Sequence, residues 1–190
     1  MTRISAVVIA FAALLASPAA ADNNRRFGLM LDAGVPDGAT GSLVYRPWSW
    51  LRVHGGGGYN LVSPGVRAGI TLAPLPGTTT LTLNLDGGRY FGGDANPLAR
   101  MITGDETVDV AALRDVGYDY ANFHVGFEFG RKFATFYLHA GMSYVTGEMK
   151  NASETFSGID SYTTVEFKGD PRINIWTPSL RLGLIVYFMR

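Results

Sequence analysis

The residues of this chain that could do chemistry are charged side chains, histidines and a tyrosine that alternate with apolar residues along several stretches. Paired guanidinium and carboxylate groups could form an ion-pair network, and two facing histidines could bind a metal. No third metal ligand stands at a suitable spacing, so a hydrogen-bonded polar network without metal or other cofactor is the preferred interpretation. Its expected members are Asp32, Arg52, Arg67, Asp86, His124, Glu128, Tyr137, His139 and Arg181.

The turns expected between neighbouring segments predict which of these residues meet. One turn is centred between residues 76 and 77, and another consists of residues 131 and 132. Each turn sets residues that are equally far from its centre opposite one another, at the separation of a cross-strand pair. The first and last segments are expected to meet where the chain closes on itself. The expected pairs are Arg67 with Asp86, His124 with His139, Glu128 with Thr135, and Asp32 with Arg181.

These residues lie in eight segments in which apolar and polar side chains alternate. A period of two is what a β-strand imposes, because successive side chains point to opposite faces of the sheet. The clearest case is the end of the chain, where Leu180, Leu182 and Leu184 alternate with Arg181 and Gly183. The segments predicted as strands are 26–35, 40–46, 50–59, 65–73, 79–91, 118–130, 133–145 and 180–188.

The apolar faces of these segments predict a closed barrel in a membrane. About nine residues are the length of a tilted strand that crosses a bilayer, and in hydrocarbon every backbone N–H and C=O must be paired, so the sheet has to close. An arginine facing lipid near the midplane costs roughly 2–4 kcal/mol, so the charged faces must point inward. The competing interpretation is a soluble lipocalin-like barrel, with the apolar faces inward and the charges outward. Aromatic residues expected near the two interfaces are Tyr45, Trp48, Trp50, Phe129, Phe133 and Phe188 at one end, and Tyr59, Tyr90, Phe91, Tyr118, Tyr144 and Trp176 at the other.

The beginning of the chain is interpreted as a secretion signal. Arg3 supplies a positive charge, residues 4–16 an apolar run, and Ala19–Ala21 an A-x-A cleavage site. The run is shorter than the roughly 20 residues that a membrane-spanning helix needs. Residues 1–21 are therefore expected to be the signal peptide, and residues 22–190 one barrel domain.

The lengths of the connections predict an orientation. The connections 47–49, 74–78 and 131–132 are short, whereas 92–117 and 146–171 are long and acidic. Outer-membrane barrels keep short turns in the periplasm and longer loops outside. The sequence thus predicts short periplasmic turns and two long extracellular loops. The alternating stretch 163–168 indicates that the last hairpin projects as a β-ribbon with an exposed edge.

The charge balance argues against a nucleic-acid partner. The chain carries 16 basic and 16 acidic side chains and no cysteine. A protein that binds nucleic acid through phosphate contacts needs a basic excess, and none is present. The absence of cysteine fits a barrel that is closed by backbone hydrogen bonds better than a small extracellular module, in which disulfides are common.

The predicted fold is all-β: an eight-stranded, antiparallel, up-and-down transmembrane β-barrel. It resembles the small bacterial outer-membrane barrels, the class of the OmpA transmembrane domain and OmpX. The resemblance is architectural and covers residues 22–190; its sharpest residues are Tyr187 and Phe188 at the end of the last strand. It implies a Gram-negative outer membrane, contact with lipid and lipopolysaccharide, and insertion by the barrel-assembly machinery, which in that class reads a terminal aromatic strand. Met189 and Arg190 follow Phe188, where that class usually ends on the aromatic residue.

The function expected from this architecture is non-enzymatic: a structural role in the envelope, or adhesion or binding to an extracellular partner through loops 92–117 and 146–171. The alternatives are a lipid A-modifying enzyme and a narrow, porin-like channel. The deacylase barrels, which are similar in outline, use a histidine and a serine two residues apart together with a glutamate. Here His139 and Ser143 are four residues apart, and the chain has no G-x-S-x-G, HExxH or phosphate-loop motif.

Overall fold

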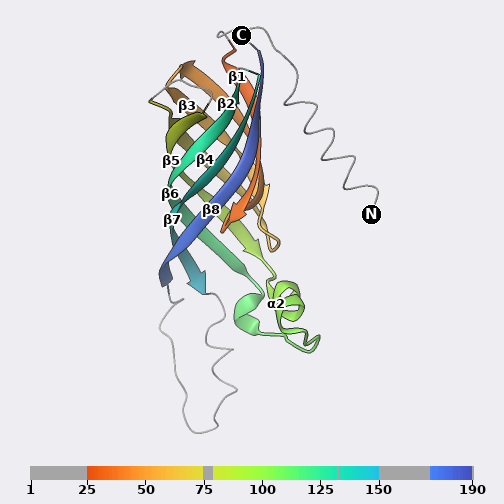
Figure 1. Ribbon diagram of the computed structural model, residues 1–190. Helices are drawn as coiled ribbons and strands as arrows, with labels where there is room; N and C mark the ends of the chain where they lie inside the picture. Colours follow the sequence, from red (N-terminus) through yellow and green to blue (C-terminus); the bar gives the residue numbers. More distant parts are fainter. Residues whose placement is uncertain (1–24, 75–78, 132, 150–171, 190) are drawn as a thin grey trace, which may run out of the picture.

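The protein is a closed barrel of eight antiparallel strands, each paired with its neighbours in the sequence, with β1 pairing with β8 (Figure 1). The computed structural model describes residues 25–74, 79–131, 133–149 and 172–189. The predicted all-β, up-and-down barrel is thereby confirmed, whereas the expected signal peptide and the stretch 163–168 lie outside the described residues. The strands are β1 (Phe27–Val35), β2 (Gly38–Trp48), β3 (Leu51–Tyr59), β4 (Pro64–Leu72), β5 (Thr79–Gly93), β6 (Val116–Arg131), β7 (Ala134–Met149) and β8 (Arg172–Met189).

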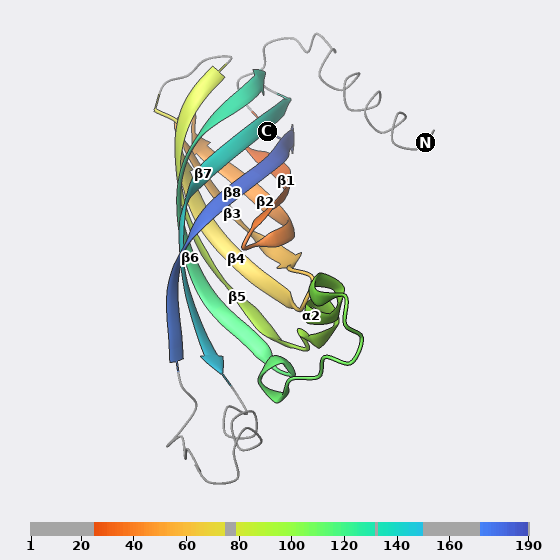
Figure 2. The same cartoon turned by 60° about the horizontal axis from the view of Figure 1, so that its bottom comes forward.

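The wall of the barrel is higher on one side. β1 to β4 have 9 to 11 residues, whereas β5 to β8 have 15 to 18, and the longer strands extend beyond the shorter ones at the end opposite the termini (Figures 1 and 2). The prediction that the last strand begins at Leu180 is wrong, since β8 begins at Arg172. The apolar residues Ile173 and Ile175 stand at odd positions, whereas Leu180 and the apolar residues that alternate after it stand at even positions. The pattern of apolar and polar residues that marks the rest of the strand is therefore absent here.

The two faces of the strands are oriented as predicted. Leu83, Phe123 and Leu182 lie on the outside and are 37%, 54% and 48% exposed. Arg67 and Arg181 lie inside, where they are 4% and 1% exposed. A lipocalin-like barrel, which would have these apolar side chains inside and the arginines outside, is therefore excluded.

Two aromatic expectations need correction. Tyr90 was expected near an outer interface but is buried in the barrel, where its hydroxyl donates to the carbonyl oxygen of Asp37. Tyr118 has the same parity, and its hydroxyl donates to the carbonyl oxygen of Pro36 at 3.1 Å. Both rings occupy inward positions, because residues next to Arg89 and Asp119, whose side chains are exposed, must face the other way. Other aromatic residues lie outside as predicted, among them Trp48, Trp50, Phe129, Phe188, Tyr59, Phe91 and Trp176.

The connection between β5 and β6, predicted only as a polar segment, contains two helices. They are α2 (Asn96–Thr103) and the 3-10 helix η1 (Ala111–Leu113). Pro97 stands in the first turn of α2, where its missing N–H costs nothing, and Gly104 ends the helix in the left-handed conformation, with φ 70°. The Asn96 side chain bonds the backbone of Val110 at both its amide and its carbonyl, which ties the helix to the returning chain. Among the described residues, neither helix is long and apolar enough to cross a membrane.

Gly141 marks a place where two strands approach too closely for a side chain. A Cβ added there would stand 1.9 Å from the carbonyl oxygen of Phe123 and 2.8 Å from the Cα of His124. We therefore expect Gly141→Ala to lower the free energy of unfolding by about 1–3 kcal/mol, measured by urea titration of the refolded barrel. The matched control is Gly41→Ala, whose added Cβ meets only the flexible end of Leu31 at 3.5 Å; an equal loss there would contradict the explanation.

Candidate functional site

The interior of the barrel holds every polar residue singled out from the sequence. Period-two alternation turns each of them inward, and their exposed fractions are at most 8%. These residues come from β1, β3, β4, β5, β6, β7 and β8, so they reach the barrel axis from nearly the whole circumference. They are Asp32, Arg52, Arg67, Asp86, His124, Glu128, Tyr137, His139 and Arg181.

Arg181 is the centre of this interior. Its Nη2 donates to a carboxylate oxygen of Asp37 and, at 2.7 Å, to Oδ2 of Asp86. Its Nε lies 3.8 Å from Oδ1 of Asp32, which is the contact expected where the first and last strands close. One guanidinium on β8 is thus shared by carboxylates from β1, from the β1–β2 turn and from β5.

Asp32 is the second centre. Both of its carboxylate oxygens accept from the guanidinium of Arg67, the Oδ1 contact being 2.9 Å. It also accepts from the hydroxyl of Thr40 at 2.5 Å and from that of Tyr137 at 2.7 Å, while Arg67 Nε donates to Ser42 Oγ at 2.9 Å. Charge-assisted bonds of this kind are stronger than neutral ones, so Asp32 links β1, β2, β4 and β7 across the barrel.

A separate pair lies nearer to the end with the termini. The guanidinium of Arg52 on β3 donates to Oε1 of Glu128 on β6, and both side chains are buried. β3 and β6 are not neighbours in the sheet. The pair therefore crosses the interior and connects opposite walls.

The two histidines do not face each other directly, although their rings are close. His124 lies opposite Gly141 and His139 opposite Gly126, and the ring centroids are 6.4 Å apart. His139 Nε2 is 3.0 Å from Thr82 Oγ1. The described residues contain no group of three or more His, Cys, Asp or Glu that could hold a metal.

The tautomer of His124 follows from its neighbour Ser179. The Ser179 hydroxyl donates its proton to the carbonyl oxygen of Val35 at 2.7 Å. Nε2 of His124, 2.7 Å from the same hydroxyl oxygen, must therefore be the donor of that contact. A histidine held this way braces β6 against β1 and β8.

Three of the four predicted pairs have a wrong register. Arg67 lies opposite Gly88, and Asp86 lies opposite Gly69, so these two do not form the expected cross-strand pair. Glu128 lies opposite Tyr137 rather than Thr135. In each hairpin the strands are shifted by two residues from the expected register, which leaves every side chain on the face predicted for it.

Asp37 is an interior residue that the sequence pattern did not indicate. It stands in the β1–β2 turn, yet its side chain is 1% exposed and folds into the barrel. Besides Arg181, it accepts from Asn122 Nδ2 at 3.0 and 3.1 Å, and the Asn122 carbonyl oxygen in turn accepts from the hydroxyl of Ser143. The Pro36-Asp37-Gly38 sequence signals a turn, and nothing in a turn signal tells which way an aspartate points.

The fold and the interior define a class of structure: a closed eight-stranded barrel, apolar outside and filled by ion-paired side chains. Comparison with protein-family models, with curated proteins and with solved structures finds no match to this chain. Chemically, the interior can brace the walls and block the axis, because its charged side chains form ion pairs with one another.

Removal of Arg67 is expected to open this interior to ions. Arg67→Ala deletes a buried guanidinium and leaves Asp32 without its closest cation. In planar bilayers we expect no resolved conductance from the native barrel and cation-selective openings from the variant. Arg114→Ala, which changes an exposed pair with Asp109 in the β5–β6 connection, is the control and should stay closed. Equal conductance of the native barrel and the Arg67 variant would contradict a blocking role for the ion pairs.

Proposed function

We propose that this chain is an outer-membrane β-barrel protein of a Gram-negative bacterium with a non-enzymatic role, either structural in the envelope or in binding through its extracellular loops. One observation carries the proposal: a closed sheet has apolar side chains on its outside and buried, ion-paired charges on its inside. In water this arrangement exposes the apolar surface. In a bilayer it satisfies the backbone and both faces at once.

The orientation proposed places the termini in the periplasm. Arg25 Nη1 donates to the carbonyl oxygen of Tyr187, so the two ends of the described barrel meet. The segment with α2 and η1 leaves from the opposite end, on the higher side of the wall (Figure 1). The connection lengths read from the sequence support this orientation, because outer-membrane barrels keep short turns in the periplasm and longer loops outside. The connections 47–49, 74–78 and 131–132 are short, and 92–117 and 146–171 are long.

The β5–β6 connection supports a binding role, because it is an ordered element. Arg114 donates from Nε and Nη2 to Asp109 at 3.2 and 2.9 Å, and this contact holds the pKa of Asp109 below its ordinary value. Arg100 Nε donates to the carbonyl oxygen of Val108 at 2.7 Å. A connection braced by its own side chains presents a defined surface, as binding loops on rigid scaffolds do.

Membrane fractionation with gel electrophoresis tests the proposal. The mature protein is expected in the outer-membrane fraction, shortened near Ala21, and its unheated form is expected to migrate differently from its heated form. Recovery of the folded protein in the periplasmic soluble fraction would overturn the proposal.

The enzymatic alternative receives a separate experiment. Ser143 Oγ donates to Asn122, His139 Nε2 contacts Thr82, and both side chains are buried in the barrel, away from acyl chains on the outside. We expect lipid A of unchanged structure, by mass spectrometry, from cells expressing the native chain or the variant with His139→Gln and Ser143→Ala. An acyl chain removed only by the native chain would establish the enzyme instead.

A further inference from the structure

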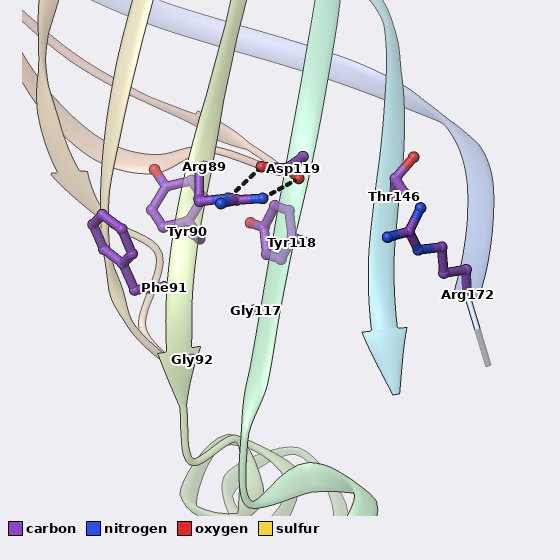
Figure 3. A pocket seen from close by; sticks show the side chains of 9 residues that line it. All are labelled: Arg89, Tyr90, Phe91, Gly92, Gly117, Tyr118, Asp119, Thr146 and Arg172. Atoms are coloured by element: carbon purple, nitrogen blue, oxygen red, sulfur yellow. Dashed lines mark hydrogen bonds and ion pairs between the residues drawn. The ribbon is translucent and has the colours of Figure 1, made fainter. Parts of the chain in front are cut away.

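A recess of about 350 Å³ lies on the higher wall, lined by β5, β6, β7 and β8 (Figure 3). Its charged residues belong to the outward-facing set. The side chains of Arg89 and Asp119 are 63% and 51% exposed, whereas the neighbouring Tyr90 is buried in the interior. These charged side chains therefore face what surrounds the barrel, at the end opposite the termini, whereas Tyr90 and Tyr118, which also line the recess, occupy inward positions.

The lining of the recess carries the guanidinium groups of Arg89 and Arg172 and the carboxylate of Asp119, and Glu148 lies opposite Arg172 in the register of β7 and β8. Arg89 Nε and Nη2 donate to the carboxylate of Asp119 at 2.7 and 2.8 Å. Arg172 reaches from β8 toward Thr146 on β7, so both arginines converge on the strands between them (Figure 3). An exposed ion pair adds little to stability, so Arg89 can turn to a second anion at small cost. A guanidinium fork matches the oxygens of a phosphate.

An apolar groove of about 270 Å³ lies directly beside the recess, toward the middle of the barrel. Arg89, Asp119 and Thr146 form one outward row across the strands, and the next outward row contains Ala121, Tyr144 and Trp176. Two residues along a strand separate the rows, which is about 7 Å. Side chains that line the groove are Leu85, Ala121, Phe123, Met142, Tyr144 and Trp176.

The groove exists because Ala121 and its cross-strand neighbour Gly87 are both small. The rings of Tyr144 and Trp176 lie 5.0 Å apart as a tilted pair along one side of it. Aromatic rings of this kind favour the level at which lipid headgroups meet acyl chains. The recess with the two arginines thus lies on the headgroup side of the pair, and the apolar groove on the hydrocarbon side.

We infer that the recess and the groove together bind one phosphorylated lipid of the outer leaflet. Its phosphate lies against Arg89 and Arg172, and one acyl chain lies in the groove over Ala121. The inference rests on the proposed function, because it requires this wall to stand in a membrane. What supports it is the order of the two sites along the strands, which is that of phosphate and chain in a lipid molecule.

Trp176 supplies a natural reporter for the test. The chain has 3 tryptophans, and the other two, Trp48 and Trp50, are stacked at the end with the termini. The variant with Trp48→Phe and Trp50→Phe is refolded into phosphatidylcholine vesicles that contain brominated-chain phosphatidylcholine or brominated-chain phosphatidic acid. Quenching of Trp176 then reports which lipid occupies the groove. We expect an association constant about fivefold higher for phosphatidic acid, the gain that one basic residue gives near an anionic surface.

Three variants on this background separate the parts of the inference. Arg89→Gln combined with Arg172→Gln is expected to abolish the preference for phosphatidic acid. Ala121→Phe, which fills the groove and leaves both arginines in place, is expected to lower the preference as well. Arg26→Gln removes an exposed positive charge at the opposite end and is expected to leave the preference unchanged.

The outcomes distinguish this inference from the proposed function. No quenching of Trp176 by brominated phosphatidylcholine in the heat-modifiable, folded protein would mean that the wall does not meet lipid, and both would fail. Equal quenching by the two lipids, or a preference that survives the double arginine substitution, would overturn the inference alone. If the preference is lost in the double arginine variant but kept in Ala121→Phe, the part of the inference that places an acyl chain in the groove is wrong.

Discussion

Arg181→Met is expected to lower the free energy of unfolding by about 3–5 kcal/mol, because breaking a buried ion pair leaves its partner charge uncompensated. Here the loss affects three carboxylates, since Asp32, Asp37 and Asp86 all lie within 4 Å of this guanidinium. Methionine keeps much of the side-chain volume, so the result reports the charge rather than a cavity. Urea titration in lipid vesicles, followed by heat-modifiable migration, measures the change.

Two further variants show where the loss comes from. Arg114→Met removes one partner of an exposed pair with Asp109 and should change stability by at most about 1 kcal/mol. Adding Asp37→Asn to Arg181→Met removes one of the stranded charges and should restore part of the stability. Equal, small effects of Arg181→Met and Arg114→Met would contradict the ion-paired interior.

Leu182→Arg is the second large effect, and its size depends on what surrounds the barrel. Leu182 lies midway along the outward apolar face of β8 and is 48% exposed. In a bilayer we expect a loss of about 2–4 kcal/mol, the cost of arginine facing lipid near the midplane. On a water-exposed surface the same substitution usually stays within about 0.5 kcal/mol. Urea titration of the variant in vesicles measures the difference.

The position of the charge supplies the matched control. Tyr59 is 51% exposed at the end of β3, where an interface is expected, so Tyr59→Arg should cost only about 0–1 kcal/mol. A depth-dependent pair of results supports a bilayer around the barrel. If both variants stay near the native stability, the proposed membrane location is wrong.

The alternation of side chains was enough to predict the strands, their order and the faces they present. Leu182 outside and Arg181 inside follow from a period of two and from the cost of a charge in lipid. Register could not be predicted in the same way. A shift by two residues preserves every face, so the pattern around Arg67 and Asp86 fits both the expected and the observed pairing equally well.

The partners of the interior charges were also out of reach of the sequence. Arg67 pairs with Asp32, and Arg181 pairs with Asp86. Each contact crosses the barrel between two strands that are not neighbours in the sheet. Such contacts depend on barrel width and strand stagger, which no local pattern encodes. Asp37 was missed for a related reason, because a turn residue carries no periodicity to indicate its direction.

The unequal height of the wall means that the seam between β1 and β8 does not run the full length of the barrel. β1 ends at Val35, opposite Leu180, whereas β8 continues to Arg172. Among the described residues, the peptide groups of 172–178 therefore meet a partner only on the β7 side. This unpaired margin, at the end opposite the termini, is a place where another polypeptide could pair with the sheet. Pro178 stands within it and offers no N–H, which is how natural sheets blunt such margins.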